Sequence, residues 1–226
     1  MTQTLTASRA VEAPASTATD TTGTTALLAC GAVAGPLFIG VAVIQALTRA
    51  GFDPRRHPLS LLSLGDLGWI QIANFVVAGV LFVACAVGMR RVLQPGRGGT
   101  WGPRLIGAFG VSLIAGGVFV ADPGLGFPPG APAGIPDQLS WHGLLHAFAP
   151  VTGFLALIAA CFVVARRFAA LGQRGWAAYS VANGVVVLAL SAWPNPGLDF
   201  VPLWIATALG FGWASVMAAR LMRYEP

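Results

Sequence analysis

Three histidines are the residues of this sequence whose type and spacing could do chemistry. His142 and His146 are four residues apart, so on a helix they project from one face about one turn apart, where two imidazoles can share a metal ion. His57 could supply a third ligand, and zinc is the metal that such a site would hold. A carboxylate that positions a metal-bound water could come from Asp66, Asp122 or Asp137.

The same histidines have a structural alternative. One can satisfy backbone groups where a helix begins, and the other can hydrogen-bond inside a helix bundle. No glutamate follows the first histidine of the His-x-x-x-His pair, and nothing in the sequence shows that the loops meet. The spacing alone therefore favours the structural alternative over a metal site.

A second group of polar residues lies mainly in residues 52–69, where charged side chains alternate with leucines. This mixture predicts either a segment at the mouth of a pocket or a re-entrant plug held by salt bridges. Arginines here can pair with acids or with lipid phosphates. The residues of the predicted polar pocket are Asp53, Arg55, Arg56, His57, Asp66 and Asp122.

The composition shows which elements must position these side chains. Of the 226 residues, 56% are hydrophobic and 9% are charged, whereas a soluble domain carries about 25% charged residues. The mean hydropathy is +0.74. These values indicate an integral membrane protein and exclude an ordinary soluble domain. The net charge of +5 comes from arginines scattered at the ends of apolar runs, so nucleic acid is not an expected partner.

We predict an all-α, polytopic membrane protein with a bundle of six transmembrane helices. Each of six stretches lacks Asp, Glu and Arg and is long enough to cross a hydrocarbon core of about 30 Å. The predicted spans are residues 25–47, 69–89, 105–121, 143–165, 176–193 and 201–219. Residues 1–24 are expected to form a disordered tail, because they contain too few apolar groups to order themselves, and residues 220–226 form a second short tail.

The arginines predict the orientation. Ten of the thirteen fall on the side of the predicted spans that carries both termini, and Arg49, Arg55 and Arg56 fall on the other. The positive-inside rule then places both termini in the cytosol and the histidines on the outer face of the plasma (inner) membrane. Within the spans, Gly31 and Gly35 predict close helix packing.

The sequence also resembles a known family. The run HPLSLLSLG at residues 57–65, followed by GWIQ at 68–71 and NF at 74–75, resembles the signature of a bacterial membrane family filed as domain of unknown function 998. The similarity extends over roughly residues 25–220. It implies a six-helix membrane protein and carries no activity with it.

Two weaker likenesses concern function. The polar first outer loop is distantly similar to six-span proteins of the Frag1/DRAM/Sfk1 type, which are associated with membrane and lipid homeostasis. The His-x-x-x-His pair resembles that of the ceramidase and adiponectin-receptor zinc hydrolases. This chain departs from the hydrolases in having six predicted spans instead of seven and no Ser-x-x-x-His pattern. The likeness serves as a chemical analogy only.

Three functional hypotheses follow. The first is binding or handling of a lipid or small amphiphile in an outward-facing polar pocket, with membrane lipids as partners. The second, from a different class, is a metal-dependent intramembrane hydrolase that uses His57, His142 and His146. A secondary transporter has less support, because no charged residue lies in the middle of a predicted span.

Overall fold

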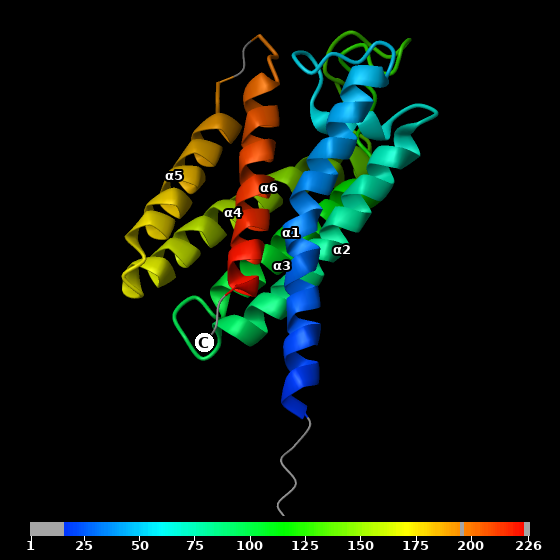
Figure 1. The fold of residues 1–226 in the computed structure, drawn as a ribbon. Coiled ribbons are helices and arrows are strands. Elements are labelled where there is room, and N and C mark those ends of the chain that lie inside the picture. The colour runs from blue at the N-terminus through cyan, green and yellow to red at the C-terminus, as the bar shows by residue number, and fades with distance from the viewer. Residues whose placement is uncertain (1–15, 195–196, 224–226) are drawn as a thin grey trace, which may run out of the picture.

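The computed structural model describes residues 16–194 and 197–223, and the long elements within them are all helices (Figure 1). A short 3-10 helix, η1, lies between the first two. The elements are α1 (Ser16–Thr48), η1 (Leu59–Ser63), α2 (Gly68–Leu93), α3 (Trp101–Val118), α4 (Trp141–Ala170), α5 (Arg174–Ser191) and α6 (Val201–Met222).

Five of the described helices are long and apolar enough to cross a membrane, namely α1, α2, α3, α4 and α6. The helix outside this set, α5, begins with Arg174 and carries Asn183 near its middle, and these polar residues lower its hydropathy. The prediction of a multi-pass, all-helical membrane protein is confirmed. The sixth span stays a prediction.

Most helix ends differ from the predicted spans by one to five residues, and the start of α1 differs by nine. Helix α1 begins at Ser16, nine residues before the predicted start, and near its beginning the Thr25 hydroxyl donates to the Thr21 carbonyl 3.0 Å away. The predicted tail therefore lies partly in a helix, and its residues 1–15 lie outside the described residues. Helix α3 ends at Val118, because Phe119 takes an extended conformation.

The six helices form a ring in which each packs against its neighbours in the chain, and α6 closes the ring by packing against α1. The start of α1 and the end of α6 lie at the same end of the bundle, and the loops 49–67 and 119–140 lie at the other end (Figure 1). We call that second end the outer end. This arrangement brings the loops before α2 and α4 together.

The GxxxG pair on α1 packs as predicted. A Cβ on Gly31 would overlap Cys85 of α2, and a Cβ on Gly35 would overlap the Phe211 carbonyl and Ser215 of α6. The Ser215 hydroxyl accepts from the Gly35 amide at 3.0 Å and donates to the Gly31 carbonyl at 2.8 Å. The missing side chains therefore allow α1 to contact both neighbours closely.

Amides link α1 to α2 in the outer half of the bundle. Gln45 Nε2 donates to Gln71 Oε1 over 2.7 Å, and Asn74 Nδ2 donates to the Phe38 carbonyl over 3.0 Å. All three side chains are buried. These side chains hold two helices together, a common role of polar residues in membrane bundles.

Aromatic side chains fill the centre of the ring. The Phe38 and Phe211 rings stack with centroids 4.4 Å apart, and Phe109 meets Phe211 edge-on at 5.0 Å. Phe82 completes this group with a contact to each of Phe109 and Phe211. These rings from four helices form a solid core on which the site at the outer end is built.

Candidate functional site

His57 joins the loops 49–67 and 119–140 to the start of α6. Its Nδ1 accepts from the Asp53 amide at 2.9 Å, and its Nε2 donates to the Leu125 carbonyl at 3.0 Å. Its own carbonyl accepts from Trp204 Nε1 at 3.1 Å. A further backbone bond, from the Phe200 amide to the Arg55 carbonyl, is 2.8 Å long. Since both ring nitrogens have partners and the residue is 4% exposed, His57 fastens the loops to one another.

An aromatic cluster surrounds this histidine. Phe52 contacts His57, Phe127 and Trp204, with ring centroids 5.1, 5.1 and 6.2 Å apart. The Arg49 guanidinium lies 5.3 Å from the centre of the Phe127 ring. It also donates to two carbonyls of the first loop, Leu62 and Leu64.

Two opposing effects act on the pKa of the Arg49 guanidinium. Burial lowers the pKa of the Arg49 guanidinium, and the nearby Asp66 carboxylate acts in the opposite direction. Its hydrogen bonds go to the backbone carbonyls of Leu62, within η1, and Leu64, directly after it. Arg49 therefore holds η1 against the outer end of α1.

The residues of the predicted polar pocket are spread over this outer end. Asp53 accepts from the Arg55 amide in a local turn at 2.9 Å. The side chains of Arg55, Arg56 and Asp66 are exposed. Asp122 lies apart from them in hydrogen-bonded contact with the start of α4. The structure brings the loops together, and none of these predicted residues lines the cavity described below.

Asp122 fixes the start of α4. Its carboxylate accepts from the Ser140 hydroxyl at 2.6 Å and from the Ser140 amide at 2.8 Å, and Ser140 in turn caps α4 by accepting from the Gly143 amide at 3.0 Å. The hydrogen bond from the Ser140 hydroxyl is the main cause that lowers the pKa of Asp122. His142 Nδ1 lies 3.9 Å from this carboxylate.

His142 and His146 share one helix face, as their spacing predicts, and this face contacts the end of α3. His142 Nδ1 donates to the Val120 carbonyl at 2.9 Å, and His146 Nδ1 donates to the carbonyls of Phe119 at 2.7 Å and Gly116 at 3.2 Å. The last carbonyls of a helix have no partners within the helix. The two imidazoles therefore supply the hydrogen bonds that α3 lacks where it stops.

These contacts also determine which nitrogen carries the proton. A carbonyl oxygen can only accept, so Nδ1 is the protonated nitrogen of His142 and of His146 in the neutral rings. Nε2 of His146 is then a hydrogen-bond acceptor, and it has no partner within residues 16–194 and 197–223. His146 is 7% exposed.

The zinc hypothesis needs three ligands in one place. Among the described residues, no group of three or more His, Cys, Asp and Glu side chains could hold a metal ion. Both nitrogens of His57 are occupied by Asp53 and Leu125. The predicted set of His57, His142 and His146 is therefore not assembled in this structure.

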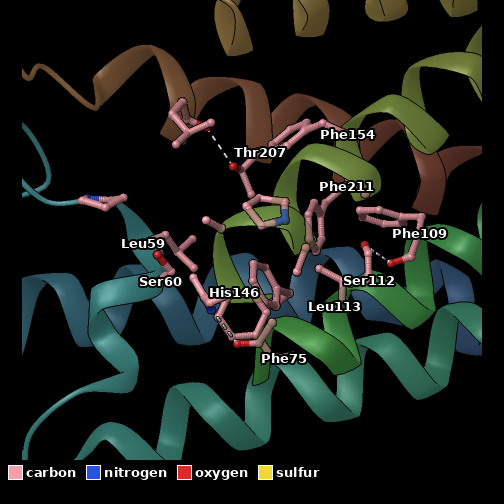
Figure 2. Close-up of a pocket in the computed structure, with 18 of the residues that line it drawn as sticks. Leu59, Ser60, Phe75, Phe109, Ser112, Leu113, His146, Phe154, Thr207 and Phe211 are labelled. Atoms are coloured by element: carbon pink, nitrogen blue, oxygen red, sulfur yellow. Dashed lines mark hydrogen bonds between the residues drawn. The ribbon is translucent and has the colours of Figure 1, made fainter. Parts of the chain in front are cut away.

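A cavity of about 280 Å³ lies beneath the joined loops (Figure 2). Its lining comes from the segment 58–60 and from α1, α2, α3, α4 and α6. The lining is mostly apolar, and within the described ranges it includes no charged side chain. The residues around it are Phe38, Pro58, Leu59, Ser60, Phe75, Phe109, Ser112, Leu113, Gly116, His146, Ala147, Ala149, Pro150, Gly153, Phe154, Leu203, Trp204, Thr207 and Phe211.

Sequence reasoning found His146 and missed the rest of this lining. The missed residues are mainly aromatic, aliphatic or small, and such residues are common throughout a membrane bundle. One local signal was available in α4, where Pro150 and Gly153 lie within the helix. The polar loop 52–69 indicated the correct end of the molecule, because Pro58, Leu59 and Ser60 line the cavity.

One comparison with known proteins gives a match. The family model described as Protein of unknown function (DUF998) matches residues 32–221. No curated protein and no solved structure matches the chain.

Proposed function

This chain belongs to the DUF998 family, whose description names no activity, and we propose from the cavity that it binds one hydrocarbon chain of a membrane lipid or small amphiphile. The observation that carries the proposal is an uncharged, mostly apolar cavity inside a ring of membrane-type helices. An apolar cavity of about 150 Å³ already binds benzene, and this one measures about 280 Å³.

The position of the cavity supports access from the bilayer. Ala147 and Pro150 of α4 are exposed and also line the cavity, and Leu203 of α6 is half-buried in the same lining. No described residue of α5 lines it. The cavity therefore opens on the side where α4 and α6 face the lipid, and a hydrocarbon chain can enter without crossing water.

The proposed orientation follows the arginines. All six helices cross the plasma membrane, both termini are cytosolic, and the cavity lies in the outer half of the bilayer. The shared end of the bundle at which α1 starts and α6 stops supports this arrangement (Figure 1). Nε2 of His146 would then lie near the level of the lipid headgroups.

Photolabelling tests the proposal. The full chain is placed in phosphatidylcholine vesicles that contain hexadecane carrying a diazirine, and labelled residues are mapped by mass spectrometry after illumination. Every membrane protein is labelled on its lipid-facing surface, so the informative positions are Phe38, Phe109 and Phe211, which are at most 3% exposed. We expect label at these positions. Label confined to exposed positions such as Phe148 and Leu155 would contradict the proposal.

A pair of variants on one helix supplies the control. Ala147→Trp fills the open side of the cavity, whereas Val151→Trp places the same side chain one turn further along α4, at an exposed position that does not line the cavity. Both substitutions are on the surface, so neither should change stability by more than about 0.5 kcal/mol. We expect Ala147→Trp to abolish label at the buried phenylalanines and Val151→Trp to preserve it.

A further inference from the structure

Three polar side chains within the cavity have already used their protons. The Ser112 hydroxyl donates to the Phe109 carbonyl at 2.7 Å, and the Thr207 hydroxyl donates to the Leu203 carbonyl at 2.7 Å. His146 Nδ1 donates to the end of α3. Each of these three residues lines the cavity (Figure 2). What they leave for a ligand is acceptor atoms only.

These acceptors differ in how firmly they are held. A hydroxyl rotates about its C–O bond and is free to change partners. The imidazole of His146 cannot turn away, because its Nδ1 is fixed by two carbonyls. Nε2 is therefore a fixed, unpartnered acceptor on a side chain that is more than nine-tenths buried. Because His146 also lines the cavity, a ligand that donates to Nε2 gains a hydrogen bond that a purely apolar ligand cannot make.

The surroundings exclude a charged donor. No charged side chain of the described residues lines the cavity to balance an ammonium group, and an unpaired buried charge is far more costly than a buried hydroxyl. A carboxylate has no donor to meet in the deep part of the cavity. Among the described residues, Ser60 is the polar lining residue that makes no side-chain hydrogen bond, and it is half-buried beside Leu59 of η1.

We infer that the ligand is a neutral, single-chain amphiphile with a hydroxyl group, whose O–H donates to Nε2 of His146 while its hydrocarbon chain packs among the phenylalanines. The inference rests on the proposed function and deepens it, because it names the headgroup chemistry of the same site. His146 then has two tasks: Nδ1 completes the end of α3, and Nε2 selects a hydrogen-bond donor.

A matched pair of competitors tests this. Tetradecanol and its methyl ether have the same hydrocarbon chain, and only the alcohol can donate a hydrogen bond. Each is added to the photolabelling vesicles, and its concentration is expressed as the measured mole fraction in the bilayer. We expect the alcohol to displace label from Phe109 and Phe211 about fivefold to tenfold more effectively than the ether, which is the effect of one hydrogen bond.

Two asparagine variants separate recognition from structure. The amide of Asn takes the place of Nδ1, so His146→Asn keeps a donor for the α3 carbonyls and removes Nε2. We expect its preference for the alcohol to fall below about twofold. His142→Asn makes the same change at a residue that does not line the cavity, and its preference should equal that of the parent.

A spectroscopic measurement covers the case in which His146→Asn does not fold. In the parent protein labelled with ¹⁵N-histidine, tetradecanol should shift the Nε2 resonance of His146 and its methyl ether should not. Equal competition by the two compounds, or equal shifts, would overturn the inference and leave the proposed function intact. Absence of label from the buried phenylalanines would overturn the proposed function itself.

Discussion

His57 and His146 lie at the same outer end of the protein, and they differ in what remains free. His57 has a partner at each ring nitrogen and a third bond through its carbonyl, so two outer loops and the start of α6 depend on it. His146 has one nitrogen fixed by α3 and one left beside an apolar cavity. Both ring nitrogens of His57 are hydrogen-bonded within the protein, whereas Nε2 of His146 remains available to a ligand.

The same contrast holds for their surroundings, the outer loops and the cavity. In the loops, Arg49 and Asp122 have their hydrogen-bonding groups directed at backbone carbonyls or at Ser140. In the cavity, acceptors remain open among aromatic rings. The polar groups of the loops therefore hydrogen-bond mainly within the protein. The proposed binding of a ligand depends on Nε2 of His146, which lies in apolar surroundings.

Removing the His57 side chain should give the largest effect. His57→Ala leaves the Asp53 amide and the Leu125 carbonyl without partners and opens a gap beside Phe52 and Phe127. We expect a loss of about 3 kcal/mol in the free energy of unfolding, measured by denaturant titration in detergent micelles. His142→Ala is the matched control, since His142 is partly exposed and makes one such bond. An equal loss of stability in the two variants would contradict the larger structural role that we assign to His57.

Two arginines at the outer end should also differ in how much they stabilise the protein. Arg49→Ala removes two hydrogen bonds to the loop carbonyls and the contact with Phe127, so we expect a loss of about 2 kcal/mol. Arg55→Ala should change stability by less than about 0.5 kcal/mol, because the exposed side chain is lost while its carbonyl still accepts from Phe200. Thermal unfolding of both variants in one detergent checks this. A large loss of stability in Arg55→Ala would contradict the prediction, because it would show that the exposed side chain of Arg55 also makes a structural contact.

The sequence predicted the features that depend on residues close to one another along the chain. Long apolar runs predicted the helices, the GxxxG pair predicted close packing around Gly31 and Gly35, and the spacing of His142 and His146 placed them on one face. The partners of those histidines could not be predicted, because they are backbone carbonyls that become free only where α3 ends. The helix ends at Val118, three residues before the predicted limit of the span, where Phe119 takes an extended conformation.

The cavity could not be predicted from the sequence, for a related reason. It is formed by five long helices and one loop segment, so no short stretch of sequence contains it. Phe38 and Phe211 are 173 positions apart along the chain and yet stack at 4.4 Å. Which apolar residues fill space and which border it depends on how the helices cross, and the periodicity of one helix does not carry that information.

One substitution made at two glycines should have opposite effects. A Cβ on Gly143 would overlap the Asp122 carboxylate, which Ser140 holds in place, so Gly143→Ala should lower stability by about 1–2 kcal/mol. A Cβ on Gly116, beside the cavity, would lie 3.8 Å from the Phe75 ring in ordinary contact. Gly116→Ala should raise stability by about 0.5 kcal/mol, because alanine restricts the unfolded chain. Thermal unfolding of the two variants checks the sign of each change, and a loss in both would mean that the cavity is as tightly filled as the loops.

The smallest expected effect is the pH dependence that Asp122 contributes. The pKa of its carboxyl is lower in the folded protein than the ordinary value of about 3.9, chiefly through the Ser140 hydroxyl. A lowered pKa stabilises the fold above the unfolded value, and this stabilisation is lost as the pH falls through the folded value. Because water screens this carboxylate, we expect it to contribute about 1 kcal/mol or less.

Unfolding of the parent and of Asp122→Asn is therefore compared from pH 7 down to pH 3. The difference between them should shrink below about pH 4, where the parent's carboxyl begins to take up a proton. Ser140→Ala removes the main cause of the lowered pKa, so in that variant the loss should occur at higher pH than in the parent. Identical pH profiles for the parent and Ser140→Ala would show that the contact between α3 and α4 does not depend on this charge, and the two histidines on the α3 carbonyls would then be the main link between these helices.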